Sequence, residues 1–157
     1  MLSPLLDQTP LPLLKQVARF TERRQEVLAG NVANIDTPGY RMRDLPVAEF
    51  RQALARAIAQ LPPPADSASR YYLTGELPPA SPAGLRAPPS LEELFPETLF
   101  QAHTPREQPG ITFQDANNRS LEQQFLQMTR NTLWQNFAVE LLRRQFDQLQ
   151  MVITERP

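Results

Sequence analysis

The last part of the chain repeats apolar residues at alternating spacings of four and three positions. This repeat predicts one continuous helix over residues 121–153, because side chains seven positions apart share a stripe on a coiled-coil helix. At a rise of about 1.5 Å per residue the helix would be roughly 50 Å long, too long for a compact domain of this size to cover. The stripe, called the seam below, consists of Leu121, Phe125, Met128, Thr132, Gln135, Val139, Leu142, Phe146, Leu149 and Ile153.

The first part of the chain carries a second seam of the same kind and predicts a helix that ends near Asp36. Polar seam members, Arg24 and Asn31 here and Thr132 and Gln135 in the last helix, weaken a simple dimer but help to set its register. The seam consists of Leu14, Val17, Thr21, Arg24, Leu28, Asn31 and Ile35. Helix–helix packing is predicted at Leu14, Val17, Leu28, Ile35, Leu121, Phe125, Met128, Val139, Leu142, Phe146 and Leu149.

A tight turn ends the first helix within residues 28–44, which read LAGNVANIDTPGYRMRD. The stretch contains three poor helix formers, Gly30, Asn31 and Asn34. Their presence indicates that this stretch serves something other than helix stability. Pro38 disfavours a helical conformation for the residue before it, and Pro38 with Gly39 fits the two central positions of a type II turn.

A shorter helix is expected after the turn, starting at Pro46 and running to about Gln60, with Phe50 and Leu54 on its apolar face. Eleven prolines between residues 62 and 109 then exclude a long helix or a central strand. We expect an irregular, partly polyproline middle with one short helix around residues 90–95. The chain thus divides into residues 1–60, 61–114 and 115–157, with both terminal segments forming one mainly α-helical domain.

The composition offers little for catalysis or for binding a metal, a cofactor or nucleic acid. His103 is the single histidine and lies in a predicted loop, and the chain has no cysteine, metal-ligand spacing or phosphate-binding glycine loop. A net charge of −1 provides no basic surface for nucleic acid. The sequence shows neither a cleavable signal peptide nor an apolar run that could span a membrane. We therefore expect no enzyme, no cofactor, no metal and no direct ligand.

The apolar faces of the two long helices leave two interpretations open. The shorter helix could close an intrachain bundle over both faces. Alternatively, neighbouring subunits complete the faces, which the pattern favours because one short helix covers little of two long ones.

Residues 28–44 resemble the signature of the flagellar rod and hook family, in which an apolar helix runs into an ANxxTPGY turn. The ending LLRRQFDQLQMVI is similar to the terminal helix of that family, and the flanks RQEVLAGN and RMRDLPVAEF resemble its proximal-rod members. The resemblance covers about residues 11–60 and 115–155 and leaves the middle uncovered. It places an assembly signature on Asn31, Asn34, Thr37, Pro38, Gly39 and Tyr40.

The resemblance implies a structural subunit of the bacterial flagellar basal body rod that links the membrane base and export apparatus to the distal rod. It implies that the terminal helices pair as an antiparallel coiled coil. The implied partners are other rod subunits, copies of the chain, and basal-body or export-apparatus proteins.

The resemblance also implies export to the periplasmic rod without a cleavable signal peptide. Phe50 and Leu54 match a Phe-x-x-x-apolar export-gate motif, which Phe95 with Leu99 and Phe137 with Leu141 fit as well. The alternative function is a self-contained coiled-coil adaptor or secretion chaperone.

Overall fold

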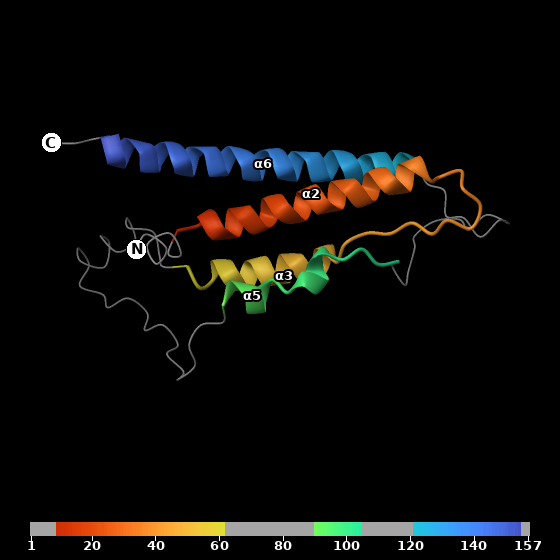
Figure 1. Cartoon of the computed structure of the whole chain (residues 1–157), viewed down its shortest axis with the longest axis horizontal. Helices are drawn as coiled ribbons and strands as arrows, with labels where there is room; N and C mark the ends of the chain where they lie inside the picture. The colour runs from red at the N-terminus through yellow and green to blue at the C-terminus, as the bar shows by residue number, and fades with distance from the viewer. Residues whose placement is uncertain (1–8, 62–89, 105–120, 155–157) are drawn as a thin grey trace, which may run out of the picture.

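A computed structural model describes residues 9–61, 90–104 and 121–154 of the chain (Figure 1). Within these ranges the protein is mainly α-helical, as predicted. The elements are α2 (Leu11–Ala33), α3 (Val47–Ile58), α5 (Leu91–Leu94), the 3-10 helix η1 (Glu97–Phe100) and α6 (Leu121–Thr154). The remainder of the predicted irregular middle, residues 62–89 and 105–114, lies outside the described residues, as do residues 115–120.

The two long helices, α2 and α6, pack against each other, as predicted, and α6 extends beyond the start of α2 (Figure 1). Asn31, near the end of α2, contacts Gln124, near the start of α6. In the middle of α2, Thr21 contacts Asn131. The first turns of α2 lie beside residues 134–141 of α6.

In the view of Figure 1, α6 lies above α2, and α3 and α5 lie below it. α3 also reaches α6, since the guanidinium carbon of Arg51 lies 4.8 Å from the centre of the Trp134 ring. The core between α2 and α3 is aromatic, since Phe20 of α2 and Phe50 of α3 stack with ring centroids 3.9 Å apart and both are fully buried. Phe95 and Phe100 contact the Phe50 ring at centroid distances of 5.4 and 6.4 Å. Clustered rings bury large apolar areas, so this group stabilises the packing of α3 on α2.

The short helix predicted around residues 90–95 is present as α5, and the Ser90 hydroxyl accepts a hydrogen bond from the Glu93 N–H at its start. The sequence did not predict that the residues after it would enter the core. Phe95, Leu99 and Phe100 are nonetheless buried there. The described part of the predicted irregular middle is therefore helical in part and packed, while the three segment boundaries stay a prediction.

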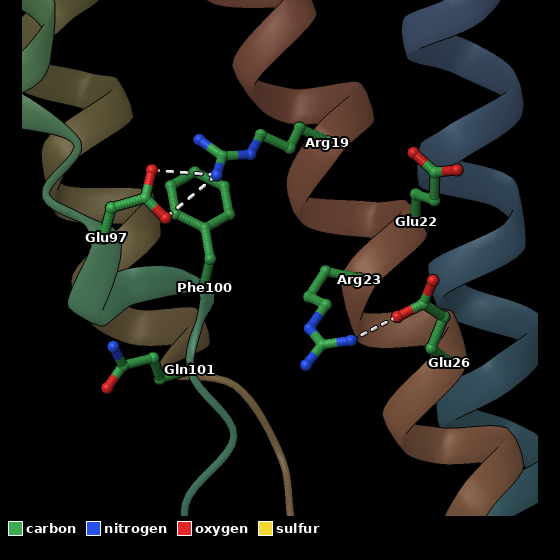
Figure 2. Close-up of a pocket in the computed structure, with 7 residues that line it drawn as sticks. All are labelled: Arg19, Glu22, Arg23, Glu26, Glu97, Phe100 and Gln101. Carbon is green, nitrogen blue, oxygen red and sulfur yellow. Dashed lines mark hydrogen bonds and ion pairs between the residues drawn. The ribbon is translucent and has the colours of Figure 1, made fainter.

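An ion pair fastens η1 to the outer surface of α2 (Figure 2). The guanidinium of Arg19 donates to both carboxylate oxygens of Glu97, at 2.8 and 2.9 Å, and lies 4.2 Å from the centre of the Phe100 ring. Both charged groups are largely exposed, so the ion pair itself contributes little to stability. The aromatic contacts carry the larger share of this packing.

Candidate assembly site

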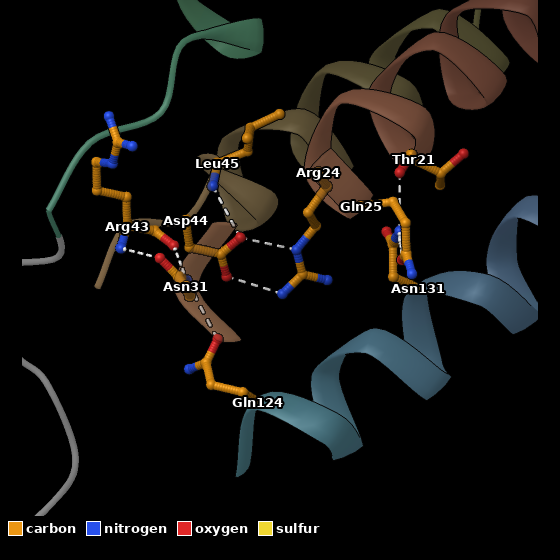
Figure 3. A network of polar contacts seen from close by, with 9 residues as sticks. All are labelled: Thr21, Arg24, Gln25, Asn31, Arg43, Asp44, Leu45, Gln124 and Asn131. Atoms are coloured by element: carbon orange, nitrogen blue, oxygen red, sulfur yellow. Dashed lines mark hydrogen bonds and ion pairs between the residues drawn. The ribbon is translucent and has the colours of Figure 1, made fainter. Parts of the chain in front are cut away.

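Asn31 joins three segments of the chain at the end of α2 (Figure 3). Its amide nitrogen donates to the Arg43 carbonyl at 2.7 Å and to the Gln124 side-chain oxygen at 3.1 Å. Its amide oxygen accepts from the Arg43 N–H at 3.0 Å and from the Tyr40 hydroxyl at 3.1 Å. With 1% of its surface exposed, Asn31 uses both donors and both acceptor positions of its amide. It thus fastens the segment after the turn to both long helices.

A second connection between α2 and this segment is the ion pair of Arg24 with Asp44 (Figure 3). Two parallel hydrogen bonds of 2.8 Å join the guanidinium to the carboxylate, and the side chains are only 12% and 22% exposed. The backbone of Asp44 also exchanges two hydrogen bonds with that of His103, at 3.0 and 3.1 Å. Arg24 was predicted to be a polar member of the helix seam, but in the structure it holds the post-turn segment.

The turn itself has the predicted conformation at its centre. Gly39 has a φ of 75°, and the Tyr40 N–H donates to the Thr37 carbonyl at 3.2 Å, as in a type II turn. Thr37, Pro38 and Gly39 are exposed. The turn therefore projects from the helices and is anchored by the residue that follows it.

Asn34 ends α2, which stops at Ala33 rather than near Asp36. The backbone N–H and the side-chain amide of Asn34 both donate to the Gly30 carbonyl, at 3.1 and 2.8 Å. Among the signature residues, Asn31 therefore connects distant segments, whereas Asn34 closes its own helix end.

The face of α6 that contacts α2 is polar or small at its most buried positions. Gln124, Asn131 and Ala138 are spaced seven residues apart and are at most 6% exposed. The Asn131 amide nitrogen donates to the Thr21 carbonyl at 2.8 Å and to the Gln25 side chain at 2.9 Å, while its buried oxygen finds no partner among the described residues. Hydrophobic periodicity does not predict this face, because two of its three most buried residues are polar. The only sequence signal for it is the repeat of amide and small side chains every seven residues.

The apolar seam predicted on α6 lies on a neighbouring flank and is largely exposed in the single chain. Thr132, assigned to this seam as a register position, is exposed and donates to the Met128 carbonyl of its own helix. The seam residues Met128, Leu142 and Leu149 are half-buried. The exposed seam residues are Leu121 at 45%, Phe125 at 51%, Val139 at 51%, Phe146 at 60% and Ile153 at 74%. The structure thus assigns α6 a polar face for α2 and an apolar flank that the described residues leave uncovered.

The seam predicted on α2 is buried to a greater extent. Leu28 is fully buried, and Leu14, Val17 and Ile35 are half-buried. The residues predicted as an export-gate motif lie inside the fold, with Phe50 fully buried and Leu54 partly buried against the same core. Phe50 therefore has a structural role in the folded chain.

The described residues contain no group of three or more acidic or histidine side chains that could hold a metal ion. His103 is exposed, and its backbone exchanges hydrogen bonds with the backbone of Asp44. In the parts that the structure describes, no helix is both long and apolar enough to cross a membrane.

Comparison with known proteins places this site in a family. A family model described as flagella basal body rod protein matches residues 21–41, the stretch that contains Arg24, Asn31 and the turn. The chain is 30% identical over 140 residues to the flagellar basal body rod protein FlgB of Escherichia coli strain K12, across 88% of each chain, and equally to that of Shigella flexneri. It is 54% identical over 33 residues to FlgB of Aquifex aeolicus strain VF5, across 21% of this chain and 27% of that one.

The paired long helices and the anchored turn define a mainly helical structural protein. The extent of the similarity shows more than that class. The chain belongs to the FlgB family of flagellar basal body rod proteins, a structural family without enzymatic activity. The family resemblance and the absence of an enzymatic role, both predicted from the sequence, are thereby confirmed.

Proposed function

We propose that the chain is an axial subunit of the rod that links the membrane base and export apparatus to the distal rod through helix–helix contacts. The observation that carries this proposal is the apolar flank of α6, which leaves Phe125, Val139 and Phe146 more than half exposed. Burial of apolar surface drives association at about 25 cal/mol per Å² before its costs are subtracted. A row of such side chains over most of a long helix suits a subunit enclosed by neighbours.

In this proposal α2 and α6 form an antiparallel coiled coil that presents the flank to the partners. The order of contacts, from Asn31 with Gln124 to the first turns of α2 with residues 134–141, supports this arrangement. The partners are other rod subunits, further copies of the chain, and proteins of the basal body and export apparatus. Leu121, Phe125, Val139 and Phe146 contact these partners, and Leu14, Val17, Leu28 and Ile35 pack within the subunit.

The assembly signature fixes the direction in which the chain leaves α2. Asn31 and Tyr40 lock the segment after the turn, while Asn34, Thr37, Pro38 and Gly39 shape the corner. The exposed turn then has a fixed conformation in which it contacts the next subunit.

We also propose that the subunit reaches the periplasmic rod unfolded and without a cleavable signal peptide. Phe50 is fully buried in the aromatic core, so an export-gate motif at Phe50 and Leu54 is accessible only before folding. Folding after export then hides the motif.

A self-contained adaptor or secretion chaperone is the second candidate. The observation in its favour is the core of Phe20, Phe50, Phe95 and Phe100, which closes within one chain. This function requires the full-length protein to act as a stable cytoplasmic monomer or small oligomer.

Basal bodies purified from a strain that carries a tagged copy in place of the native gene distinguish the two functions. A rod subunit is retained in basal bodies that have been washed free of soluble proteins, and a strain without it forms no complete rod. Recovery of the protein only in the cytoplasmic fraction, with intact rods in the deletion strain, would refute the proposal.

A further inference from the structure

An open hydrophobic groove lies where the start of α2, the end of α3 and the middle of α6 meet, with a volume of about 350 Å³. Hydrophobic side chains form its lining, including Leu14 and Val17 of α2 and Trp134 of α6. Ile58 and Phe137 in the same lining are 54% and 64% exposed, so the described residues leave the groove uncovered. Exposed hydrophobic grooves are typical of places where another chain segment or protein packs.

We propose that residues 1–8 of the same chain occupy this groove in the free subunit, with Leu2, Leu5 and Leu6 filling it. Pro10, immediately before α2, is itself part of the lining, so the segment begins at the edge of the groove. Leu5 lies five positions before Pro10, an extended reach of about 17 Å, which is enough to fold back over the adjacent helix turns.

The other segments outside the described ranges suit the groove less well. Residues 62–89 also begin at its edge, after Leu61, but they open with three prolines and contain no leucine before Leu73. Residues 155–157 read Glu-Arg-Pro and follow the end of α6. Residues 105–120 contain no leucine, so residues 1–8 alone combine attachment at the groove with three closely spaced leucines.

This contact belongs to the free subunit and goes beyond the proposed role in the rod. The docked segment shields the groove from a second copy of the chain. The same groove becomes available when the segment leaves it, and the proposed rod function stands whether or not the segment docks.

Cysteine pairs test the contact in the full-length protein, because the natural chain has no cysteine to interfere. Ser3→Cys keeps all three leucines and is combined either with Ile58→Cys in the groove or with Lys15→Cys on the exposed side of α2. Lys15 is much nearer in sequence, so an undocked segment cross-links to it at least as fast. Docking predicts that the disulfide to position 58 forms about tenfold faster in dilute solution, because burial of even one leucine favours the docked state by about that factor.

Two further results bear on the same inference. Leu5→Asp and Leu6→Asp, added to the protein with Ser3→Cys and Ile58→Cys, should slow formation of its disulfide to the rate seen with Ser3→Cys and Lys15→Cys. Equal rates for both pairs, or disulfide-linked dimers in place of the intramolecular bond, would overturn the proposal, and the dimers would identify a second copy as the occupant.

Trp134 provides a readout without cysteines, since it is the single tryptophan and lines the groove. Leu5→Asp with Leu6→Asp should raise the quenching of its fluorescence by acrylamide. The control pair Ser3→Asp with Gln8→Asp adds the same number of acidic groups to the segment and should leave quenching unchanged. An unchanged signal in the leucine variant would contradict docking.

Discussion

Asn31 is an internal amide whose hydrogen-bonding groups are all used, and this explains why a poor helix former lies in the last turn of α2. Its four hydrogen bonds join it to Tyr40 and Arg43 after the turn and to Gln124 of α6, and no apolar residue of similar size could make them. Most of the free-energy cost of such a replacement arises because buried donors and acceptors lose their hydrogen-bond partner. Asn31 therefore lowers the intrinsic stability of the helix end but fixes the path of the chain after the turn.

Asn31→Leu is expected to lower the free energy of unfolding by about 3 kcal/mol, because several buried polar groups lose their partner together. Asn34→Leu is the matched control, since its side chain bonds only within its own helix end, and it should cost less than about 1 kcal/mol. Urea denaturation followed by circular dichroism measures both. Equal losses would contradict the central role of Asn31.

The two glycines near the turn differ in backbone conformation but not in available space. A Cβ at either Gly30 or Gly39 would meet no atom within 4 Å, whereas only Gly39 has a positive φ, of 75°. Gly39→Ala should therefore destabilise the protein by about 1–2 kcal/mol, while Gly30→Ala should stabilise the helix by up to about 1 kcal/mol. Thermal unfolding of the two variants should shift in opposite directions, and shifts of the same sign would rule out the turn conformation described.

At the scale of elements, Arg24 and Asp44 join α2 to the chain that leads into α3. Their bidentate, mostly buried geometry predicts a coupling free energy of about 1.5–3 kcal/mol in a double-mutant cycle with Arg24→Ala and Asp44→Ala. Glu140 and Arg144 form an exposed pair at 3.3 Å within α6, and their cycle should yield less than about 0.5 kcal/mol. Coupling of equal size in the two cycles would show that the Arg24 pair does not anchor the segment.

The same scale shows how far the sequence could predict the fold. Periodicity located α2 and α6, and Pro38 with Gly39 predicted the turn, because these signals are local. The face of α6 that meets α2 was missed, since Gln124, Asn131 and Ala138 have no hydrophobic periodicity. The burial of Phe95, Leu99 and Phe100 was missed for another reason. These residues lie in short helical turns among prolines, and only tertiary contacts with Phe20 and Phe50 bring them into the core.

At the scale of the whole molecule, the sequence predicted which residues form the candidate site but not which contacts they make. The resemblance placed the signature on Asn31 and the turn, yet its partner Gln124 is 93 residues away in the sequence. Such long-range pairs depend on the packing of α2 on α6. The molecule that results has an internal aromatic core on one side of α2 and, along α6, an apolar flank that the described residues leave uncovered.

Phe125→Ser with Phe146→Ser tests this division of roles most directly. Both rings are more than half exposed, so the free subunit should change its free energy of unfolding by no more than about 0.5 kcal/mol. Phe50→Ser applies the same chemical change to a fully buried ring and should cost about 3–5 kcal/mol.

The decisive measurement is the amount of this double variant in basal bodies purified from a strain that lacks the native gene. We predict that the variant is expressed and folded like the natural chain but is absent from the basal bodies, and that the cells do not swim. Normal incorporation and motility with both exposed phenylalanines replaced would contradict the claim that the flank of α6 holds the subunit in the rod.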